Sequence, residues 1–423
     1  MKVFFHTLGC KVNQYETQEM REQLKKNGYE ITDDENVADI FVINSCTVTS
    51  ESDRKTRQCV RHYKKKHPES TVVLTGCMPQ SFPEMAEKLT EADIVLGNRN
   101  NKLLVNSLNE YFAGDCRVMH LTQHASGEAL ISTGITDFEE RTRATLKIED
   151  GCDRFCSYCI IPYARGPVRS RNLDDIICEA KKLVESGIKE IVLTGIHISS
   201  YGKDFKTGIG LIDVLEKVNA VEGIERIRIG SLEPIIITED FVNRIKKLDK
   251  LCNHFHLSLQ SGCDETLQRM NRRYTTEDFR RIVKLLRENI PEVCLTTDVI
   301  VGFPGETDKE FEKTFTFLKE IAFSKMHVFK YSPRKGTKAI SFPNQVDGNT
   351  KNTRSDILIS LSNENEKKFA SQYIGKSIKV LFETESEGHT TNYIKVVDKV
   401  SMQKPGSIVD VEIQGFENDY LYQ

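Results

Sequence analysis

The sequence predicts an α/β protein with an N-terminal doubly wound parallel sheet, a central partial (β/α)6 barrel and a small C-terminal all-β barrel. From residue 2 to residue 329, short apolar runs alternate with amphipathic stretches of helical period. After residue 367 this alternation ends, and short strand-like runs separated by turn residues follow each other. With 423 residues, the chain has room for two to four domains.

The N-terminal part predicts strands at 2–6, 39–44, 71–75 and 93–96, with helices at 14–27, 51–66 and 83–89 between them. Such β-α repeats form a parallel sheet of the doubly wound kind. The carboxyl ends of its neighbouring strands share one edge, where ligands bind.

The central part predicts six further strands, at 144–149, 190–194, 226–230, 254–259, 294–300 and 325–329. Helices are expected between them at 173–186, 211–221, 239–248, 276–288 and 309–321. Six units are too few for a closed eightfold barrel, so a partial barrel is predicted, with its site at the carboxyl ends of the strands.

Polar segments at 113–140 and 336–356 are expected to be linkers, the second leading into a helix at 355–369. Strands at 377–382, 392–397 and 408–414 predict a short antiparallel barrel. The predicted domains are 1–112, 141–366 and 367–423, with 113–140 as the linker.

Composition bounds the functional class. Apolar residues make up 39% and charged residues 29%, as in ordinary globular proteins. The N-terminus does not resemble a signal peptide, and no apolar run reaches the roughly 18 residues of a membrane helix, so a cytoplasmic protein without a membrane partner is expected. Twelve cysteines then indicate thiols kept for metals or catalysis. The net charge of −3 restricts any nucleic-acid site to a local basic face.

Three cysteines lie close together in the loop that leaves the 144–149 strand. Cys152, Cys156 and Cys159, here called the central trio, have the spacing CxxxCxxC. In a reducing compartment this spacing indicates a metal site rather than a disulfide. Structural zinc sites and ordinary ferredoxin clusters use four protein ligands, so three thiolates leave one metal position open.

A second set of cysteines follows the first three predicted strands. Cys10, Cys46 and Cys77, here called the N-terminal trio, are separated by 36 and 31 residues, about one βα repeat each. Each alone could be a buried small residue. Because all three occupy equivalent positions at one sheet edge, a second three-thiolate cluster is predicted.

Turns after the central strands predict a pocket beside the central trio. Glycines 195, 262, 302 and 305 permit close backbone approach there, and Glu233 and Gln260 could bind a polar small molecule.

Two surfaces could contact phosphates. Residues 54–66 hold seven basic groups and no acid, which indicates either a phosphate-tracking face or a solvated helix surface. Residues 367–423 carry a net charge of −1, so Lys376, Lys379 and Lys395 could contact phosphates or simply pack.

The motifs together resemble a known family. CxxxCxxC with Tyr158 before its last cysteine is similar to the signature of radical S-adenosylmethionine enzymes, and the N-terminal trio is similar to that of their methylthiotransferase branch. The similarity covers essentially the whole chain, and the C-terminal part resembles the TRAM RNA-binding module. Its motifs are TLGCKVNQYE, VINSC, LTGC, GCDRFCSYCIIPYARGPVRSR, LSLQSG, MNRRYT and VGFPGET.

Within that family, LGCKVNQYE, PYARGPVRSR and TGIHISSYG resemble the branch that modifies N6-threonylcarbamoyladenosine next to the anticodon (position 37) of tRNA. This implies two 4Fe-4S clusters and S-adenosylmethionine as cofactors, with the chemistry carried by the clusters rather than by a catalytic side chain. The cluster on the central trio would generate a 5′-deoxyadenosyl radical that abstracts hydrogen from adenine C2. The cluster on the N-terminal trio would carry the sulfur.

The resemblance also implies ligands and partners. Candidate S-adenosylmethionine ligands are Tyr158, Gly195, Glu233, Gln260 and Arg272, although Arg272 could instead be a solvated helix residue. Arg165, Arg169 and Arg171 could bind the tRNA backbone or the threonylcarbamoyl carboxylate, with structural ion pairing as the alternative. The expected partners are the anticodon stem-loop of tRNA, whose loop bases can be splayed out, and a reductase or flavodoxin-type electron donor.

Other functions remain open from sequence. The same reaction could act on N6-isopentenyladenosine in tRNA or on an aspartate of a ribosomal protein. A non-enzymatic iron–sulfur electron carrier, an RNA-binding protein or a zinc protein are alternatives from other classes. Cys59 is expected to face the core, and the cysteines without partner spacing are interpreted as structural: Cys116, Cys178, Cys252, Cys263 and Cys294.

Overall fold

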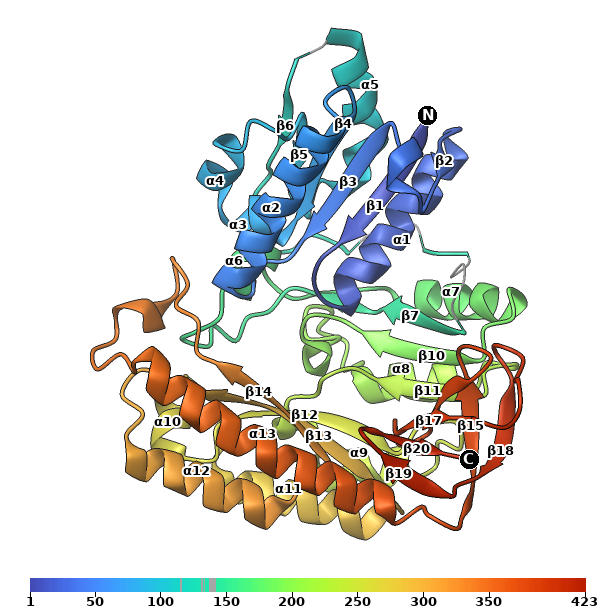
Figure 1. Cartoon of the computed structure of the whole chain (residues 1–423), viewed down its shortest axis with the longest axis vertical. Coiled ribbons are helices and arrows are strands. Elements are labelled where there is room, and N and C mark those ends of the chain that lie inside the picture. The colour runs from blue at the N-terminus through green and yellow to red at the C-terminus, as the bar shows by residue number, and fades with distance from the viewer. Residues whose placement is uncertain (115, 131, 133, 137–141) are drawn as a thin grey trace.

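The computed structural model describes residues 1–114, 116–130, 132, 134–136 and 142–423. Figure 1 shows three parts: an N-terminal lobe above, a central barrel below it, and a small C-terminal sheet against one end of the barrel. Residues 1–114 and 116–120 form the N-terminal lobe, 143–330 the central barrel, and 377–422 the C-terminal sheet.

The N-terminal lobe is a six-stranded parallel sheet in the order β2-β1-β3-β4-β5-β6, which confirms the doubly wound prediction. Every residue of β3 and β4 is buried, as expected for strands covered on both faces. Its strands are β1 (Lys2–Thr7), β2 (Glu30–Ile31), β3 (Ile40–Ser45), β4 (Thr71–Gly76), β5 (Ile94–Leu96) and β6 (Val118–His120). Its helices are α1 (Lys11–Lys26), α2 (Ser50–Lys66), α3 (Cys77–Ser81), α4 (Pro83–Glu87) and α5 (Leu104–Gly114).

The N-terminal sheet extends further along the chain than the sequence indicated. β6 lies inside the segment 113–140 that was expected to be a linker, and it pairs in parallel with β5. Two- and three-residue strands such as β2 and β6 are too short for their periodicity to be recognised. Residues 115, 131, 133 and 137–141 of that segment lie outside the described residues.

The central barrel has the six predicted strands, in two three-stranded parallel sheets, β11-β10-β7 and β12-β13-β14. Two isolated bridges, Ile227–Leu251 and Leu232–Leu257, join the sheets into one curved wall. The strands are β7 (Arg143–Lys147), β10 (Glu190–Thr194), β11 (Arg226–Ile229), β12 (His254–Gln260), β13 (Cys294–Val301) and β14 (Lys325–Lys330).

All five predicted helices pack against these strands. Thr238, Thr275 and Thr307 precede three of them, and each side chain accepts a hydrogen bond from a helix N–H, which fixes where the helix begins. The helices are α7 (Leu173–Glu185), α8 (Leu211–Asn219), α9 (Glu239–Ile245), α11 (Thr276–Asn289) and α12 (Asp308–Ile321). A short helix, α10 (Asp264–Arg269), was not predicted.

The helix α13 (Gly348–Ser371) is longer than predicted at both ends, so the linker expected at 336–356 is half helix. Asp347 caps its first turn, and no proline or further glycine interrupts it before residue 371. It therefore crosses the domain limit predicted at 366/367, and Ala370 packs into the core of the C-terminal sheet.

The C-terminal part is all-β, as predicted, with strand order β18-β15-β16-β17-β20-β19. All neighbours are antiparallel except β17 and β20, which pair in parallel. The strands are β15 (Ser377–Phe382), β16 (Glu387–Thr390), β17 (Lys395–Val397), β18 (Ile408–Glu412), β19 (Gly415–Glu417) and β20 (Tyr420–Tyr422). Among the described residues, every helix is too short or too polar to cross a bilayer.

Candidate active site

The N-terminal trio gathers at the carboxyl edge of the N-terminal sheet. Cys10 follows β1, Cys46 follows β3, and Cys77 begins α3 directly after β4. A Cβ atom on Gly9 would lie 3.1 Å from the Cβ of Cys46, so the first two loops are in contact. Gly76 has a φ of +100°, and a Cβ there would lie 2.5 Å from the carbonyl oxygen of Ser45, so only glycine permits this approach before the third cysteine.

The three thiols of this trio share one electrostatic environment. Burial, helped by the charges of Cys46 and Cys10 and opposed by that of Arg165, raises the pKa of Cys77 to about 12. Burial and the charge of Cys10 also raise the pKa of Cys46. Bringing these thiolates together therefore requires a compensating positive group.

The central trio lies in the loop between β8 (Glu149–Asp150) and the short helix α6 (Ile161–Arg165). Gly151 has a φ of +89°, and a Cβ there would lie 1.9 Å from the carbonyl oxygen of Pro167, so only glycine can precede Cys152. The N–H of Cys159 donates to the carbonyl of Cys156 at 2.9 Å, which closes a tight turn. Burial and neighbouring thiolates raise the pKa of Cys152 and of Cys159 to about 12.

The helix α6 connects the two trios. It begins two residues after Cys159, and its last residue, Arg165, donates from Nε to the Sγ of Cys77 at 3.2 Å. Five helical residues rise by only about 7.5 Å. The two sets of cysteines are therefore held close together, on opposite sides of the interface between the lobe and the barrel.

Arg272 supports the prediction that residues from distant strands meet at the central trio. Its Nη1 donates to the Sγ of Cys156 at 3.2 Å, and its Nη2 lies 3.7 Å from the Oε1 of Glu233. Burial and the charge of Cys156 raise the pKa of Tyr158, while the charge of Arg272 opposes them. The Tyr158 phenol is therefore close enough to Cys156 and Arg272 to feel their charges. Arg272 is therefore buried beside the trio rather than solvated.

Glu233 is surrounded by positive groups. The Nε2 of His197 lies 3.0 Å from its Oε2, and Arg154 forms an ion pair with the same oxygen. Burial alone would raise the pKa of Glu233, but the hydrogen bond from His197 and the charges of Arg272, His197 and Arg154 lower it to about 2. Arg154 and His197 were not predicted as site residues, although both lie inside quoted motifs, GCDRFC and TGIHISSYG.

Gly195 and Gln260 differ from the other candidates. A Cβ on Gly195 would lie 2.6 Å from Oε2 of Glu149, so this glycine makes room for a buried carboxyl. Gln260 ends β12 with a φ of +72°, and among the described residues its side chain makes no hydrogen bond to Glu233 or Arg272. The structure thus brings Tyr158, Glu233 and Arg272 together, with Gly195 and Gln260 at the ends of neighbouring strands.

The donor set fits a cluster and a polar small molecule. Within the described part of the chain, no three His, Cys, Asp or Glu side chains are already arranged to hold a metal ion. Three converging thiols without a fourth suit a larger cluster with an open position. Beside them, Oε1 of the fully buried Glu149 and Nε of Arg154 have no hydrogen-bond partner among the described residues. Two buried polar atoms without partners at the carboxyl ends of the strands indicate where a polar ligand would bind.

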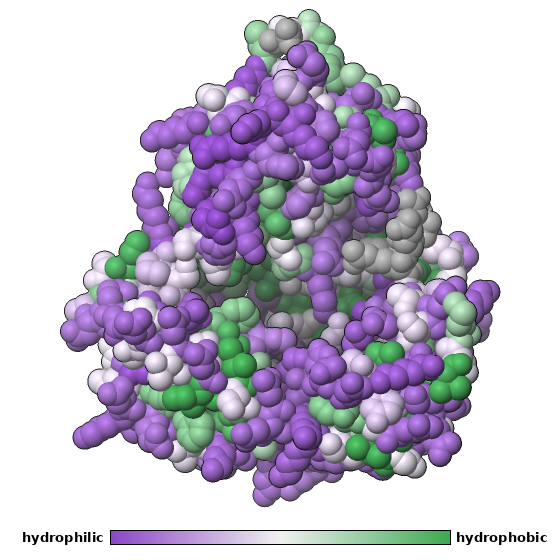
Figure 2. All heavy atoms as spheres, viewed as in Figure 1, coloured by the Kyte–Doolittle hydropathy of each residue, from purple (hydrophilic) through white to green (hydrophobic). Residues whose placement is uncertain are grey.

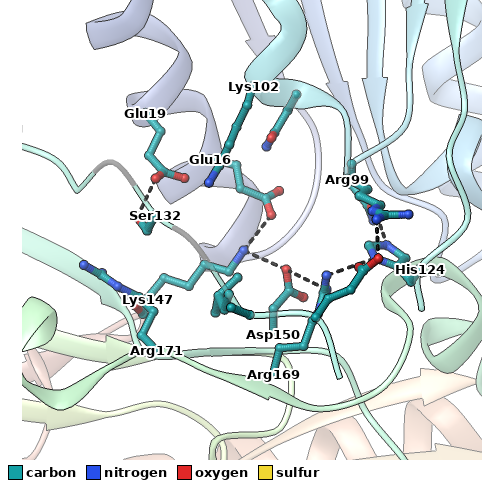
Figure 3. Close-up of a pocket in the computed structure, with 15 residues that line it drawn as sticks. Glu16, Glu19, Arg99, Lys102, His124, Ser132, Lys147, Asp150, Arg169 and Arg171 are labelled. Atoms are coloured by element: carbon teal, nitrogen blue, oxygen red, sulfur yellow. Dashed lines mark hydrogen bonds and ion pairs between the residues drawn. The ribbon is translucent and has the colours of Figure 1, made fainter. Parts of the chain in front are cut away.

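A cavity of about 410 Å³ lies between the lobe and the barrel (Figure 3). Lys147 reaches across it, with its Nζ 2.8 Å from Glu16 of α1 and 2.8 Å from Asp150. Burial would lower the pKa of Lys147, but Asp150 and Glu16 raise it above its usual value, so the lysine stays charged. The cavity is therefore walled by an ion-pair network that spans the interface.

The three arginines proposed as substrate ligands belong to this network. Arg165 has no exposed surface and pairs with Glu16, with Nη2 3.0 Å from Oε2. Arg171 pairs with Glu179 at 2.7 Å, and Arg169 donates to His124 at 3.0 Å. Only Arg169 and Arg171 line the cavity, and protein groups already bind all three. Their role as substrate ligands stays a prediction. The contacts of all three arginines are those expected from the alternative, structural ion pairing.

The basic helix α2 is mostly ion-paired. Arg54, Arg61, Lys64 and Lys66 pair with acids of the same lobe. Cys59 is half-buried at the edge of the lobe core, with its sulfur 3.5 Å from His6. In the C-terminal sheet, Lys376 and Lys395 pair with Glu292 and Glu387.

The cysteines interpreted as structural divide into two groups. Cys252, Cys263 and Cys294 are buried, which agrees with a role in packing. Cys116 and Cys178 are exposed, so packing does not account for them.

Comparison with known proteins places both halves of this site in described families. The model of the radical SAM superfamily matches residues 146–318, and that of the uncharacterized protein family UPF0004 matches residues 2–97. The first match contains the central trio, and the second contains the N-terminal trio.

Curated relatives match nearly the whole chain. The threonylcarbamoyladenosine tRNA methylthiotransferase MtaB of Bacillus subtilis (strain 168) is 42% identical over 421 residues, covering 97% of this chain and 93% of the relative. The tRNA-2-methylthio-N(6)-dimethylallyladenosine synthase of Clostridium tetani is 37% identical, covering 97% and 93%. Among solved structures, the radical S-adenosylmethionine methyltransferase TsrM of Kitasatospora setae aligns with a TM-score of 0.56 at 16% identity, covering 78% of this chain and 72% of that one.

Proposed function

The chain belongs to the radical S-adenosylmethionine methylthiotransferases, and we propose that it adds a methylthio group to C2 of N6-threonylcarbamoyladenosine next to the anticodon of tRNA. The observation that carries this proposal is the pair of cysteine trios held on either side of α6. Methylthiolation needs two reactive centres close to one atom, because a C–H bond must be broken and sulfur delivered at the same carbon.

The central trio would hold one 4Fe-4S cluster and the N-terminal trio a second, with S-adenosylmethionine bound by the residues around Glu233. Bound there, these groups supply radical chemistry and sulfur, which no side chain offers. The chain's own residues set the geometry. Arg272 donates to Cys156 while its guanidinium faces Glu233, so the thiolate and the carboxylate are held at fixed positions.

The polar atoms without partners support a site for S-adenosylmethionine at this position. Glu233 is ionised, since its pKa is near 2, and it can accept a hydrogen bond or face a positive charge. Glu149 is fully buried, which raises its pKa, and its Oε1 has no hydrogen-bond partner among the described residues and is free to bind a polar ligand. Tyr158, Gly195 and Gln260 complete the proposed ligand set from the neighbouring strand ends.

The proposed substrate, tRNA, would enter between the lobe and the rest of the molecule. Figure 2 shows that the surface is hollowed there, with hydrophilic residues around the hollow. On α2, the cations of Lys55, Arg57 and Lys65 have no ion-pair partner among the described residues and would contact phosphates. We further propose that the chain works in the cytoplasm, where its tRNA substrate is, with a reductase or a flavodoxin-type protein as its electron donor.

Nucleoside analysis tests the proposal most directly. In tRNA from a strain that lacks this gene, mass spectrometry should show N6-threonylcarbamoyladenosine without its 2-methylthio derivative. If the derivative persists, the proposed substrate is wrong. Loss of the methylthio group from N6-isopentenyladenosine instead would favour the activity named for the Clostridium tetani relative.

A second assay separates an enzyme from a non-enzymatic iron–sulfur protein. Reduced protein mixed with S-adenosylmethionine should release 5′-deoxyadenosine and methionine. An electron carrier or a simple RNA-binding protein would release neither. Iron and sulfide analysis should give about eight irons per chain for two 4Fe-4S clusters, whereas a zinc protein would contain no sulfide.

A further inference from the structure

The inside of the partial barrel contains two neighbouring cavities to which the proposed function assigns no ligand. Their volumes are about 460 and 330 Å³, within the usual range for small-ligand pockets. Lys11 and Tyr393 line both cavities, so the two lie side by side and share part of their wall. We call the two together the luminal cavity.

All three parts of the molecule contribute to the luminal cavity. Arg228 and His254 project from barrel strands, Lys11 is the first residue of α1, and Tyr393 lies in the turn between β16 and β17. Figure 1 shows the first turn of α1 above β7, and the two elements are in contact. Lys11, in the wall of the cavity, follows Cys10 of the N-terminal trio directly in the chain.

Tyr393 closes the cavity at the end that faces the C-terminal sheet. Its ring stacks on His389 at 4.8 Å between centroids, and the guanidinium of Arg228 lies over it at 4.6 Å. Arg228 also donates to the carbonyls of Thr391 and Thr390 at 2.9 and 3.2 Å. Ring contacts and hydrogen bonds therefore make this end a polar floor of the cavity.

The charges in the cavity leave one cation without a partner. Arg228 is 2.9 Å from Glu190, Arg143 is 2.8 Å from Glu383, and Lys325 is 2.7 Å from Glu366. Asp298 lies 3.3 Å from His256, and Asp419 is exposed at the rim. By contrast, no hydrogen bond or ion pair joins the ammonium group of Lys11 to any described residue.

A second polar group there also lacks a partner. His254 is 8% exposed and lines the cavity, and its Nδ1 makes no hydrogen bond within the described part of the chain. Buried polar groups without partners are uncommon, and they indicate where a polar ligand or water binds. A cavity with one cation that lacks an ion-pair partner among the described residues suits a small polar group that ends in an anion.

We propose that the luminal cavity binds the threonylcarbamoyl arm of the substrate base, and that Lys11 forms an ion pair with its carboxylate. This inference rests on the proposed function. It assigns the ammonium group of Lys11 as the group by which the enzyme selects its substrate base. The carboxylate is the only charge that this base has and that unmodified or isopentenylated adenine lacks. An ammonium group next to Cys10 would also orient C2 of the base toward the N-terminal trio.

Equilibrium binding tests the proposal without relying on turnover. Anticodon stem-loops that carry N6-threonylcarbamoyladenosine, its methyl ester, or adenosine are titrated against cluster-loaded protein without reductant, and fluorescence anisotropy is followed. The wild type should bind the acid about tenfold more tightly than the ester, because one charged hydrogen bond is lost. Lys11→Met should bind the acid and the ester equally, and Lys11→Arg should restore the preference for the acid.

Lys26→Met is the matched control, because Lys26 is an exposed lysine at the other end of the same helix. It should leave the preference for the acid unchanged. If the wild type binds acid and ester equally, or if Lys11→Met keeps the preference, the inference is overturned. If Lys11→Met loses iron and cannot be compared, equal binding of the acid and the ester by the wild type would still overturn the inference.

Failure of the inference and failure of the proposed function are distinguishable. If wild-type protein with reductant methylthiolates the threonylcarbamoyl stem-loop but shows no preference for the acid, only the role of Lys11 fails. If it methylthiolates none of the three RNAs, the proposed function fails as well.

Discussion

The two cysteine trios are assembled by opposite routes. The central trio occupies eight consecutive residues of one loop, whereas the N-terminal trio is assembled from three loops that span 68 residues. In each, one arginine donates to a cysteine sulfur at 3.2 Å: Arg272 to Cys156 and Arg165 to Cys77. The difference is that Arg272 belongs to the same domain as its trio, while Arg165 crosses from the barrel to the lobe.

This difference makes the N-terminal trio dependent on the interface between lobe and barrel. Arg165 is held by Glu16, and Glu16 also binds Lys147, so the lobe and the barrel share one buried charge network. Arg334 adds a second link, with Nη2 2.6 Å from Asp53 of α2. A sulfur-delivering site at this interface would be positioned against the central trio by the same contacts that join the domains.

The largest expected effect separates the tasks of the trios. Replacing all three cysteines of either trio by alanine should lower iron from about eight to about four per chain and abolish methylthiolation. Only the variant of the N-terminal trio should still cleave S-adenosylmethionine to 5′-deoxyadenosine. If instead the variant of the central trio cleaves S-adenosylmethionine, the tasks of the two trios are assigned the wrong way round.

The two arginines should differ in their effect on stability. Arg165→Met leaves Glu16 buried with one partner fewer and should lower the free energy of unfolding by about 3–5 kcal/mol. Arg272→Met should cost about 1–3 kcal/mol, because Glu233 keeps Arg154 and His197. Anaerobic urea unfolding of both loaded variants measures the difference, and equal losses would contradict the asymmetry.

Acid should weaken the interface near the N-terminal trio. Burial and the charge of Arg169 lower the pKa of His124 to about 4, whereas an unfolded histidine titrates near 6.5. Between these values the unfolded chain binds a proton that the native chain does not, so stability falls as pH drops from about 6.5 to about 4.

For the partly exposed His124, this loss should be on the order of 1 kcal/mol. Urea unfolding of wild type and His124→Gln at pH 7 and pH 5 measures it. Glutamine can accept from Arg169 and donate to Asn98 without titrating, so its stability should change less with pH. A variant as acid-sensitive as the wild type would exclude His124 as the cause.

The smallest expected effect concerns α2. Lys55→Gln combined with Lys65→Gln should lower the slope of log K against log salt for tRNA binding by about one per lysine. Lys66→Gln is the control, because Lys66 already pairs with Glu35 and should change the slope less. An unchanged slope in the double variant would mean that this face is simply solvated.

The fold was predictable because its signals are local and repeated. Buried strands such as β3 and β4 are continuous apolar runs, and the cysteines after them fall one βα repeat apart, so their convergence follows from sheet topology. The extension of α13 and the short strands β2 and β6 were missed. A polar helix and two- or three-residue strands carry too little periodicity to be recognised.

The sequence by itself determined the thiols, their grouping and the family of chemistry they serve, because spacing within a loop and repetition of βα units are properties of the chain. Only the tertiary structure decided that Arg165 serves Cys77, that Glu16 binds Lys147, and that Lys11 faces the barrel interior. Such partners lie 88 and 131 positions apart. A charged residue that becomes buried needs a partner of opposite charge. The sequence shows the charged residue, but only the packing of the folded chain selects its partner.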